Sequence, residues 1–520
     1  MDFAQYRKAF DEVARNFEVS VEQFGLPFES VESCPRSRRD KTVREIQAMS
    51  AGAAEASDTS LDATERDGFA PGPFAASLEM SDIQESHSYI HCENGGASIW
   101  RGWISPACLA CRKGEQTATF FVSLKCTKNC YFCFNPNQEN YEYFRHHTRD
   151  ITAELRQAYK QGQHFNCLAV TGGEPCLHKP EVLDFLRCAK ELYPDVHVRI
   201  YTSGDLLDDA FLAELASAGL DELRFSVKPQ ETDGVQAQLF DRIGAAVKAI
   251  PDVMVEMPVI PGEEEEMRRL LLRLDAMGVR GINLLEFCFP LYNEDEFQRR
   301  DFMLRRKPYK VLYNYWYAGG LPVAGSEAAC LDLLRFAEER KLGMGVHYCS
   351  LDNKNTGQVF QQNRGFLFDD AFARSHAWLS MDTQDYFLKC ARAFEEDAVQ
   401  VCTWLEGMEG SRAVAELQAE QKISADVYPN FGHSAYEQVS RLSRDIAHSM
   451  NDRAAFLHDV PVEQRIHYDE ETASLVFPLS WARLVHEQFP RTELAQCWYV
   501  VEFDESAGPI LHEVSVNLFV

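Results

Sequence analysis

Three cysteines stand close together in the stretch KCTKNCYFCFNPNQ: Cys126, Cys130 and Cys133. A [4Fe-4S] cluster normally takes four thiolates, so three within eight residues, with no fourth in the run, leave one iron open to bind another molecule. The alternative is a zinc site that takes its fourth ligand from elsewhere, because zinc sites also use short cysteine spacings. Zinc ligands usually come in two pairs, so the triplet by itself favours iron–sulfur chemistry.

A glycine-rich turn follows the triplet by about 40 residues, in the stretch LAVTGGEP. Gly172 and Gly173 would let the end of a strand approach a ligand closely, and the carboxylate of Glu174, just before Pro175, could accept hydrogen bonds from an ammonium group. On its own, such a turn could simply begin the next helix. Because it comes one strand after a cysteine loop, it indicates a ligand site.

Together, the motif CTKNCYFC, with Phe132 before its third cysteine, and the later GGEP resemble the radical S-adenosylmethionine (SAM) superfamily over roughly residues 117–290. This resemblance implies that the open iron chelates the amino and carboxylate groups of SAM and that residues 172–175 hold the amino group. It also implies that Phe132 lies near the adenine. Reduction of the cluster would cleave SAM to methionine and a 5′-deoxyadenosyl radical.

Residues at other strand ends could contact SAM as well. Ser203 follows the third expected strand, and Ser226, which ends the fourth, is our first choice for the ribose. For each of them the alternative is an ordinary cap or turn. The resemblance also implies an electron donor such as flavodoxin or ferredoxin.

A second cysteine pair lies upstream in SPACLACRKG, where Cys108 and Cys111 have the spacing of a tetrahedral metal site. With Cys92 as third ligand and Cys34, His91 or His87 as fourth, the pair could bind a second iron or zinc. The alternative is two unligated thiols in a turn.

The joined cysteine stretches resemble the beginning of the methanogen protein-arginine C-methyltransferases, and VHYCSLDNKNTGQVFQQN resembles a downstream signature of that branch. The branch implies a peptide or protein substrate. It also uses cobalamin, but the absence of an Asp-x-His-x-x-Gly loop argues against cobalamin here and leaves methylation, epimerisation and crosslinking open. Cys349, beside His347 and Tyr348, could deliver or absorb a hydrogen atom, or be a buried structural cysteine.

The positioning elements are read from the alternation of short β-rich runs with amphipathic helical segments between about 119 and 286. Six such units are typical of a parallel sheet buried on both faces, with ligands at the carboxyl ends of the strands. The fold class is therefore α/β: a partial (β/α)6 radical SAM barrel with an N-terminal extension and a C-terminal α+β domain. The expected divisions are an N-terminal helix (1–28), a mobile linker (29–75), a cysteine-containing metal loop region (76–116), the radical SAM core (117–300), a mainly helical extension (301–455) and a small α/β C-terminal domain (456–520).

Composition limits the partners. The net charge of −28 argues against nucleic acid and anionic membrane, and the charged amino-terminal stretch argues for a cytoplasmic protein. In such a compartment the 16 cysteines would be reduced thiols and metal ligands. Two other functions are considered: small-molecule biosynthesis by radical SAM chemistry, and a zinc-stabilised adaptor without enzymatic activity.

Overall fold

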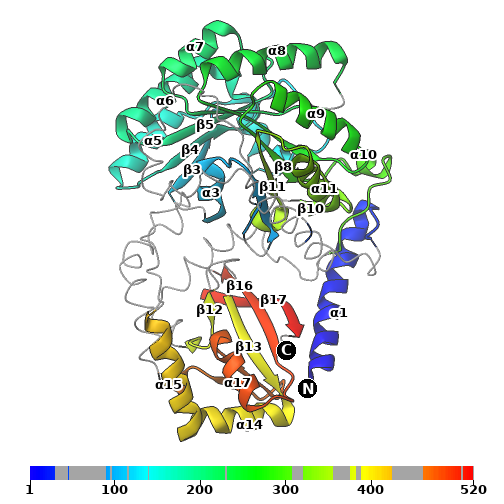
Figure 1. Ribbon diagram of the computed structural model, residues 1–520, viewed down its shortest axis with the longest axis vertical. Coiled ribbons are helices and arrows are strands. Elements are labelled where there is room, and N and C mark those ends of the chain that lie inside the picture. Colours follow the sequence, from blue (N-terminus) through cyan, green and yellow to red (C-terminus); the bar gives the residue numbers. More distant parts are fainter. Residues whose placement is uncertain are drawn as a thin grey trace, which may run out of the picture.

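The computed structural model describes most of the chain in two sheet-based units joined by a long helix (Figure 1). Most of the expected linker 29–75, with Cys34, lies outside the described residues, and so does His87. The described residues are 1–29, 45, 90–93, 96–113, 116–138, 140–228, 231–306, 320–354, 375–381, 388–423, 461–504 and 508–518.

A nine-stranded sheet forms the larger unit, in the order β1-β2-β11-β8-β7-β6-β5-β4-β3. All six expected strands are present and parallel to their neighbours. Their Val, Ile, Leu and Phe side chains lie mainly on the face that packs against helices. Their bounds are β3 (Thr117–Phe121), β4 (Cys167–Thr171), β5 (His197–Thr202), β6 (Glu222–Phe225), β7 (Asp252–Val259) and β8 (Gly281–Glu286).

The sheet continues beyond the six expected strands. Strand β11 (Gly345–Cys349) lies parallel to β8, and the hairpin of β1 (Ile90–Glu93) and β2 (Ser98–Arg101) adds to β11 in antiparallel orientation. The expected mainly helical extension over 301–455 therefore also contains a strand, β11, which joins the core sheet. Its five residues were too short a β signal beside the long helix α11 (Ser326–Glu339).

Helices cover one face of this sheet and bury its main apolar core against the strands. They are α5 (Ile151–Lys160), α6 (Lys179–Leu192), α7 (Asp209–Ser217), α8 (Asp233–Ala249), α9 (Glu264–Ala276) and α11. The short helix α3 (Pro106–Lys113) lies on the opposite face, which we call the inner face (Figure 1). That face presents Arg199, Tyr201, Arg224, Glu256, Asn283 and His347.

The smaller unit is an antiparallel sheet in the order β14-β15-β13-β16-β17, with β12 beside β13. Its strand β13 also falls within the expected mainly helical extension. Helices α14 (Glu395–Glu406), α15 (Met408–Ile423) and α17 (Ala482–Gln488) pack on one face of this sheet. The strands are β12 (Ser380–Met381), β13 (Leu388–Phe394), β14 (His467–Asp469), β15 (Ser474–Phe477), β16 (Ala495–Asp504) and β17 (Gly508–Leu518).

Helix α1 (Phe3–Val21) joins the two units (Figure 1). The Asp2 side chain caps its first turn in a capping box with Gln5. Near this end Phe3 packs on the smaller sheet, whereas Val21 at the other end packs in an aromatic cluster of the core. None of the helices in the described residues has the length and apolar character needed to cross a membrane.

Candidate functional site

The triplet Cys126, Cys130 and Cys133 lies on the loop that follows β3, which we call the cysteine loop (residues 122–138). Backbone pairing ties this loop to the end of β4: the Lys125 carbonyl accepts from the Glu174 amide at 2.8 Å. Asn135 Nδ2 adds a bond of 2.7 Å to the Gly172 carbonyl. The two motifs found in the sequence are therefore neighbours in space.

Gly172 and Gly173 make that approach possible. A Cβ on Gly173 would stand 1.9 Å from the Lys125 carbonyl oxygen, and one on Gly172 would stand 2.5 Å from the Ser123 carbonyl oxygen. Gly172 also has a φ of +116°, a conformation that side chains disfavour. Both glycines thus have a first role that the sequence analysis did not anticipate: they seat the cysteine loop against β4.

The carboxylate of Glu174 is buried and fully engaged. One oxygen accepts from the Thr202 hydroxyl at 2.8 Å and the Cys176 amide at 3.1 Å; the other accepts from the Ser203 amide at 2.7 Å and its hydroxyl at 2.6 Å. A carboxylate offers about four acceptor positions, and all are used. Glu174 therefore braces the end of β5 against the GGEP turn, which ends in the buried Pro175.

The end of β5 contacts the cysteine loop, and a polar pair lies at the end of β6. The Thr127 hydroxyl contacts Ser203 Oγ at 3.3 Å and donates to Asp205 at 3.0 Å. The ammonium of Lys228 donates to Ser226 Oγ at 3.1 Å. Ser203 and Ser226 thus lie where the strand-end rule places them, on the same side of the sheet as the cysteine loop.

The positive charge of Lys228 acts on all three thiols of the cysteine loop. Burial raises the pKa of Cys126, Cys130 and Cys133, that of Cys133 to about 11, while the positive charge of Lys228 acts on all three in the opposite direction. A buried cation beside thiols favours their thiolate form, which is the form that binds metal. Lys228 follows Ser226 at the same strand end, one of the positions at which the sequence suggested contacts to SAM.

Phe132 joins an aromatic cluster at the carboxyl ends of β7 and β8. Its ring is 5.0 Å from that of Tyr131 and 5.8 Å from that of Phe287, both edge to face. Ile260, in the apolar run that follows β7, belongs to the same cluster. This is the apolar side of the site, where the resemblance expects adenine.

A continuous polar chain crosses the inner face from β5 to β2. Arg224 Nη1 donates to the Tyr201 hydroxyl at 3.2 Å and to Glu256 at 2.6 Å, and Asn283 Nδ2 donates to the same Glu256 oxygen at 2.6 Å. The Asn283 amide oxygen is 2.9 Å from His347 Nδ1, so Nδ1 carries the proton. Burial, followed by the charge of Arg224, lowers the pKa of His347 to about 3 and keeps the ring neutral.

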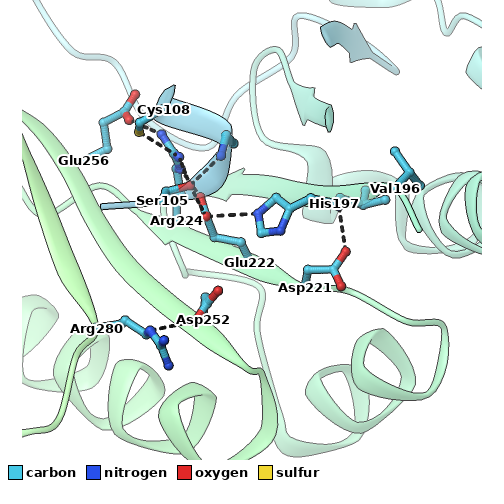
Figure 2. A network of polar contacts seen from close by, with 12 residues as sticks. Ser105, Cys108, Val196, His197, Asp221, Glu222, Arg224, Asp252, Glu256 and Arg280 are labelled. Atoms are coloured by element: carbon cyan, nitrogen blue, oxygen red, sulfur yellow. Dashed lines mark hydrogen bonds and ion pairs between the residues drawn. The ribbon is translucent and has the colours of Figure 1, made fainter. Parts of the chain in front are cut away.

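Helix α3 places Cys108 on this chain (Figure 2). Its sulfur accepts from Arg224 Nη2 at 3.2 Å and from Asn283 Nδ2 at 3.3 Å. Cys349, at the end of β11, lies on the same face as His347 and interacts electrostatically with Cys108 and Cys111. Burial raises the pKa of Cys349 to about 12.

Cys92 is not brought together with Cys108 and Cys111. It pairs with Ile99, which alternates along β2 with the inner-face residue Ser98, so Cys92 points to the opposite face of the sheet. Across the described ranges, no three His, Cys, Asp or Glu side chains converge on one metal position. A second metal bound by these three cysteines does not fit this arrangement. For the triplet, the fit to a cluster rests on the donor type, the shared loop and the cation that faces it.

Comparisons with known proteins agree with this geometry. Residues 121–274 match the family model of the radical SAM superfamily. A Methanocaldococcus jannaschii protein provisionally named a glycyl-radical enzyme activating enzyme is 27% identical over 253 residues, which are 47% of this chain and 63% of the relative. The PqqA peptide cyclase of Gluconobacter oxydans is 30% identical over 115 residues, 22% of this chain and 30% of the relative.

Among solved structures, Streptococcus suis SuiB bound to S-adenosylmethionine aligns with a TM-score of 0.32 and 13% identity, over 45% of this chain and 50% of that one. The chain spans less than two thirds of the length of either curated relative.

Proposed function

Since residues 121–274 form a radical SAM domain, we propose that this protein cleaves S-adenosylmethionine reductively and uses the resulting radical on a peptide or protein side chain. Members of the superfamily use a [4Fe-4S] cluster and SAM. The observation that carries the proposal is the seat of the cysteine loop: Gly173 admits Lys125, and Lys228 faces the three thiols. A buried cation beside three cysteines is costly unless an anionic group is held there.

When bound, the cluster and SAM supply one-electron cleavage to methionine and a 5′-deoxyadenosyl radical that abstracts a hydrogen atom. The chain's own residues hold and orient these partners. Cys126, Cys130 and Cys133 provide three thiolates. The GGEP turn, residues 172–175, would hold the amino group of SAM, while Phe132 and Ser226 would contact the adenine and the ribose.

The names of two relatives support a polypeptide substrate. One is called a peptide cyclase and the other an activating enzyme for a glycyl-radical enzyme, and both names describe chemistry on a polypeptide. Cys349 stays our candidate for delivering or absorbing a hydrogen atom, because it faces the inner side of the sheet. We further propose flavodoxin or ferredoxin as the electron donor and the cytoplasm as the compartment.

The test replaces Cys126, Cys130 and Cys133 together by Ala and compares the variant with Cys402→Ala, which removes a half-buried thiol on α14 of the smaller unit. After anaerobic reconstitution, iron, sulfide and 5′-deoxyadenosine are measured. The triple variant should lose the cluster and the nucleoside product, and Cys402→Ala should keep both. Production of 5′-deoxyadenosine by the triple variant would refute the assignment.

A further inference from the structure

Arg199 is a buried cation on the inner face, and two of its nitrogens have no hydrogen-bond acceptor among the described residues. Its side chain is 7% exposed, and in the described part of the chain neither Nε nor Nη1 has a hydrogen-bond acceptor. Nearly all buried guanidinium groups are paired, since a buried N–H without an acceptor loses its bonds to water without compensation. A buried guanidinium group without acceptors therefore indicates that a ligand can supply them.

The position of Arg199 shows where that partner would lie. Arg199 alternates along β5 with Val198 and Ile200, whose side chains belong to the apolar core under the helices, so it points to the inner face. Its guanidinium carbon is 5.6 Å from the centre of the Tyr201 ring, and it interacts electrostatically with Cys111 of α3. The empty hydrogen-bonding positions are therefore beside the polar chain, under α3.

The charges of this face leave one cation in excess. Arg224 is neutralised by ion pairs with Glu222 and with Glu256, at 2.6 Å for the second. Those two carboxylates act on Arg199 and Lys354 only at longer range. The Asp252–Arg280 ion pair, at 3.0 Å, adds one charge of each sign. In the described ranges, four cations thus share the face with three carboxylates, and a monoanion would balance them.

We propose that the inner face binds a carboxylate of the substrate through Arg199. This inference rests on the proposed function and gives it a substrate class: a polypeptide or amino acid that presents a carboxylate beneath α3. A guanidinium matches a carboxylate in charge and hydrogen-bonding geometry, and the single excess charge favours a monoanion over a dianionic phosphate.

Binding of small probes to the full chain tests the proposal by calorimetry. N-acetylglycine presents a terminal carboxylate, N-acetylaspartate α-amide presents a side-chain carboxylate, and N-acetylglycinamide has the same shape as the first without the charge. At least one carboxylate should bind, and the amide should not. The stronger of the two carboxylates identifies its source, the chain terminus or a side chain. Equal binding of N-acetylglycine and its amide, or no binding of either carboxylate, would overturn the proposal.

Arg199→Met should weaken carboxylate binding by about tenfold or more, the effect of one lost charge-assisted bond. The matched control is Arg187→Met, on an arginine that is 60% exposed in a surface pair. Because Arg199 is unpaired when no ligand is bound, Arg199→Met should also be at least as stable to urea as the wild type. A clearly less stable Arg199→Met would make Arg199 a structural ion-pair residue instead.

Two further measurements separate the explanations. The triple cysteine variant should still bind the carboxylate probe, because the site contains no cluster ligand, so loss of SAM chemistry and loss of carboxylate binding are distinguishable. Iron content is measured in Arg199→Met after reconstitution. If the variant loses iron while the triplet is intact, the anion beside Arg199 is a metal–thiolate group, and the carboxylate proposal is wrong.

Discussion

A single methyl group at Gly173 should disturb the cysteine loop. In Gly173→Ala, the new Cβ would stand 1.9 Å from the Lys125 carbonyl oxygen, although real Cβ contacts do not fall below 3.0 Å. The loop must therefore retreat by at least about 1 Å. This breaks the bonds from the Glu174 amide to Lys125, 2.8 Å, and from the Gly173 amide to Ser123, 3.1 Å. Two backbone bonds at about 1 kcal/mol each and overpacking of about 1–3 kcal/mol give a loss of about 3–5 kcal/mol.

That loss is a large part of the roughly 5–15 kcal/mol that stabilises an ordinary domain. The variant should fold, with a reduced free energy of unfolding in urea, and should retain little iron and sulfide after anaerobic reconstitution. Gly234→Ala is the matched control, since nothing lies within 4 Å of its Cβ position and neither glycine has a positive φ. Gly234 lies in α8, so its substitution should be neutral or stabilising by up to about 1 kcal/mol. Wild-type stability and iron content in Gly173→Ala would refute this account of the seat.

Three other substitutions test the surroundings of the site. Glu174→Gln replaces an oxygen that accepts two hydrogen bonds by an NH2 donor. The free energy of unfolding in urea should fall by about 2–3 kcal/mol, and a fall below about 0.5 kcal/mol would contradict the bracing role. Asp208 caps α7, and hydrogen bonding lowers its pKa, so Asp208→Ala should cost about 1 kcal/mol at neutral pH. The folded pKa is depressed, so this difference should shrink as pH falls through the carboxyl titration, and Asp208→Asn should keep most of the cap. Lys228→Met should retain less iron than the exposed-site control Lys160→Met, and equal retention would leave Lys228 without a role at the cluster.

The sequence could predict the parallel strands because their signal is local. Runs such as CLAVT and HVRIYT are short, apolar and bounded by turns, and the helices between them show their own period. The cysteine triplet and the GGEP turn could be linked because both follow strands, and strand ends meet at one edge of a parallel sheet. Strand β11 was missed because five residues between a long helix and a turn carry too little pattern.

The contacts of individual side chains could not be predicted in this way. The sequence suggested that Gly173 lets the strand end approach a ligand closely; the structure shows the Lys125 backbone in that space. Glu174 was expected to receive the SAM ammonium, but hydroxyl and amide groups from β5 already occupy its oxygens. One signal was available: Arg199 and Tyr201 in β5 alternate with apolar residues, a period that indicates one polar face.

The smaller sheet is positioned relative to the cysteine loop by helix α1. Nineteen helical residues span roughly 28 Å, and contacts of described side chains are found near both ends. At the first end the Tyr6 hydroxyl donates to Glu513 of β17. Near the other end, Arg306 of the core donates to both carboxylate oxygens of Glu18, at 2.6 and 2.7 Å. Val21 packs in the aromatic cluster that contains Phe132. That cluster includes residues of the cysteine loop. We therefore expect a displacement of the smaller unit along α1 to shift the candidate adenine side of the site before the inner face.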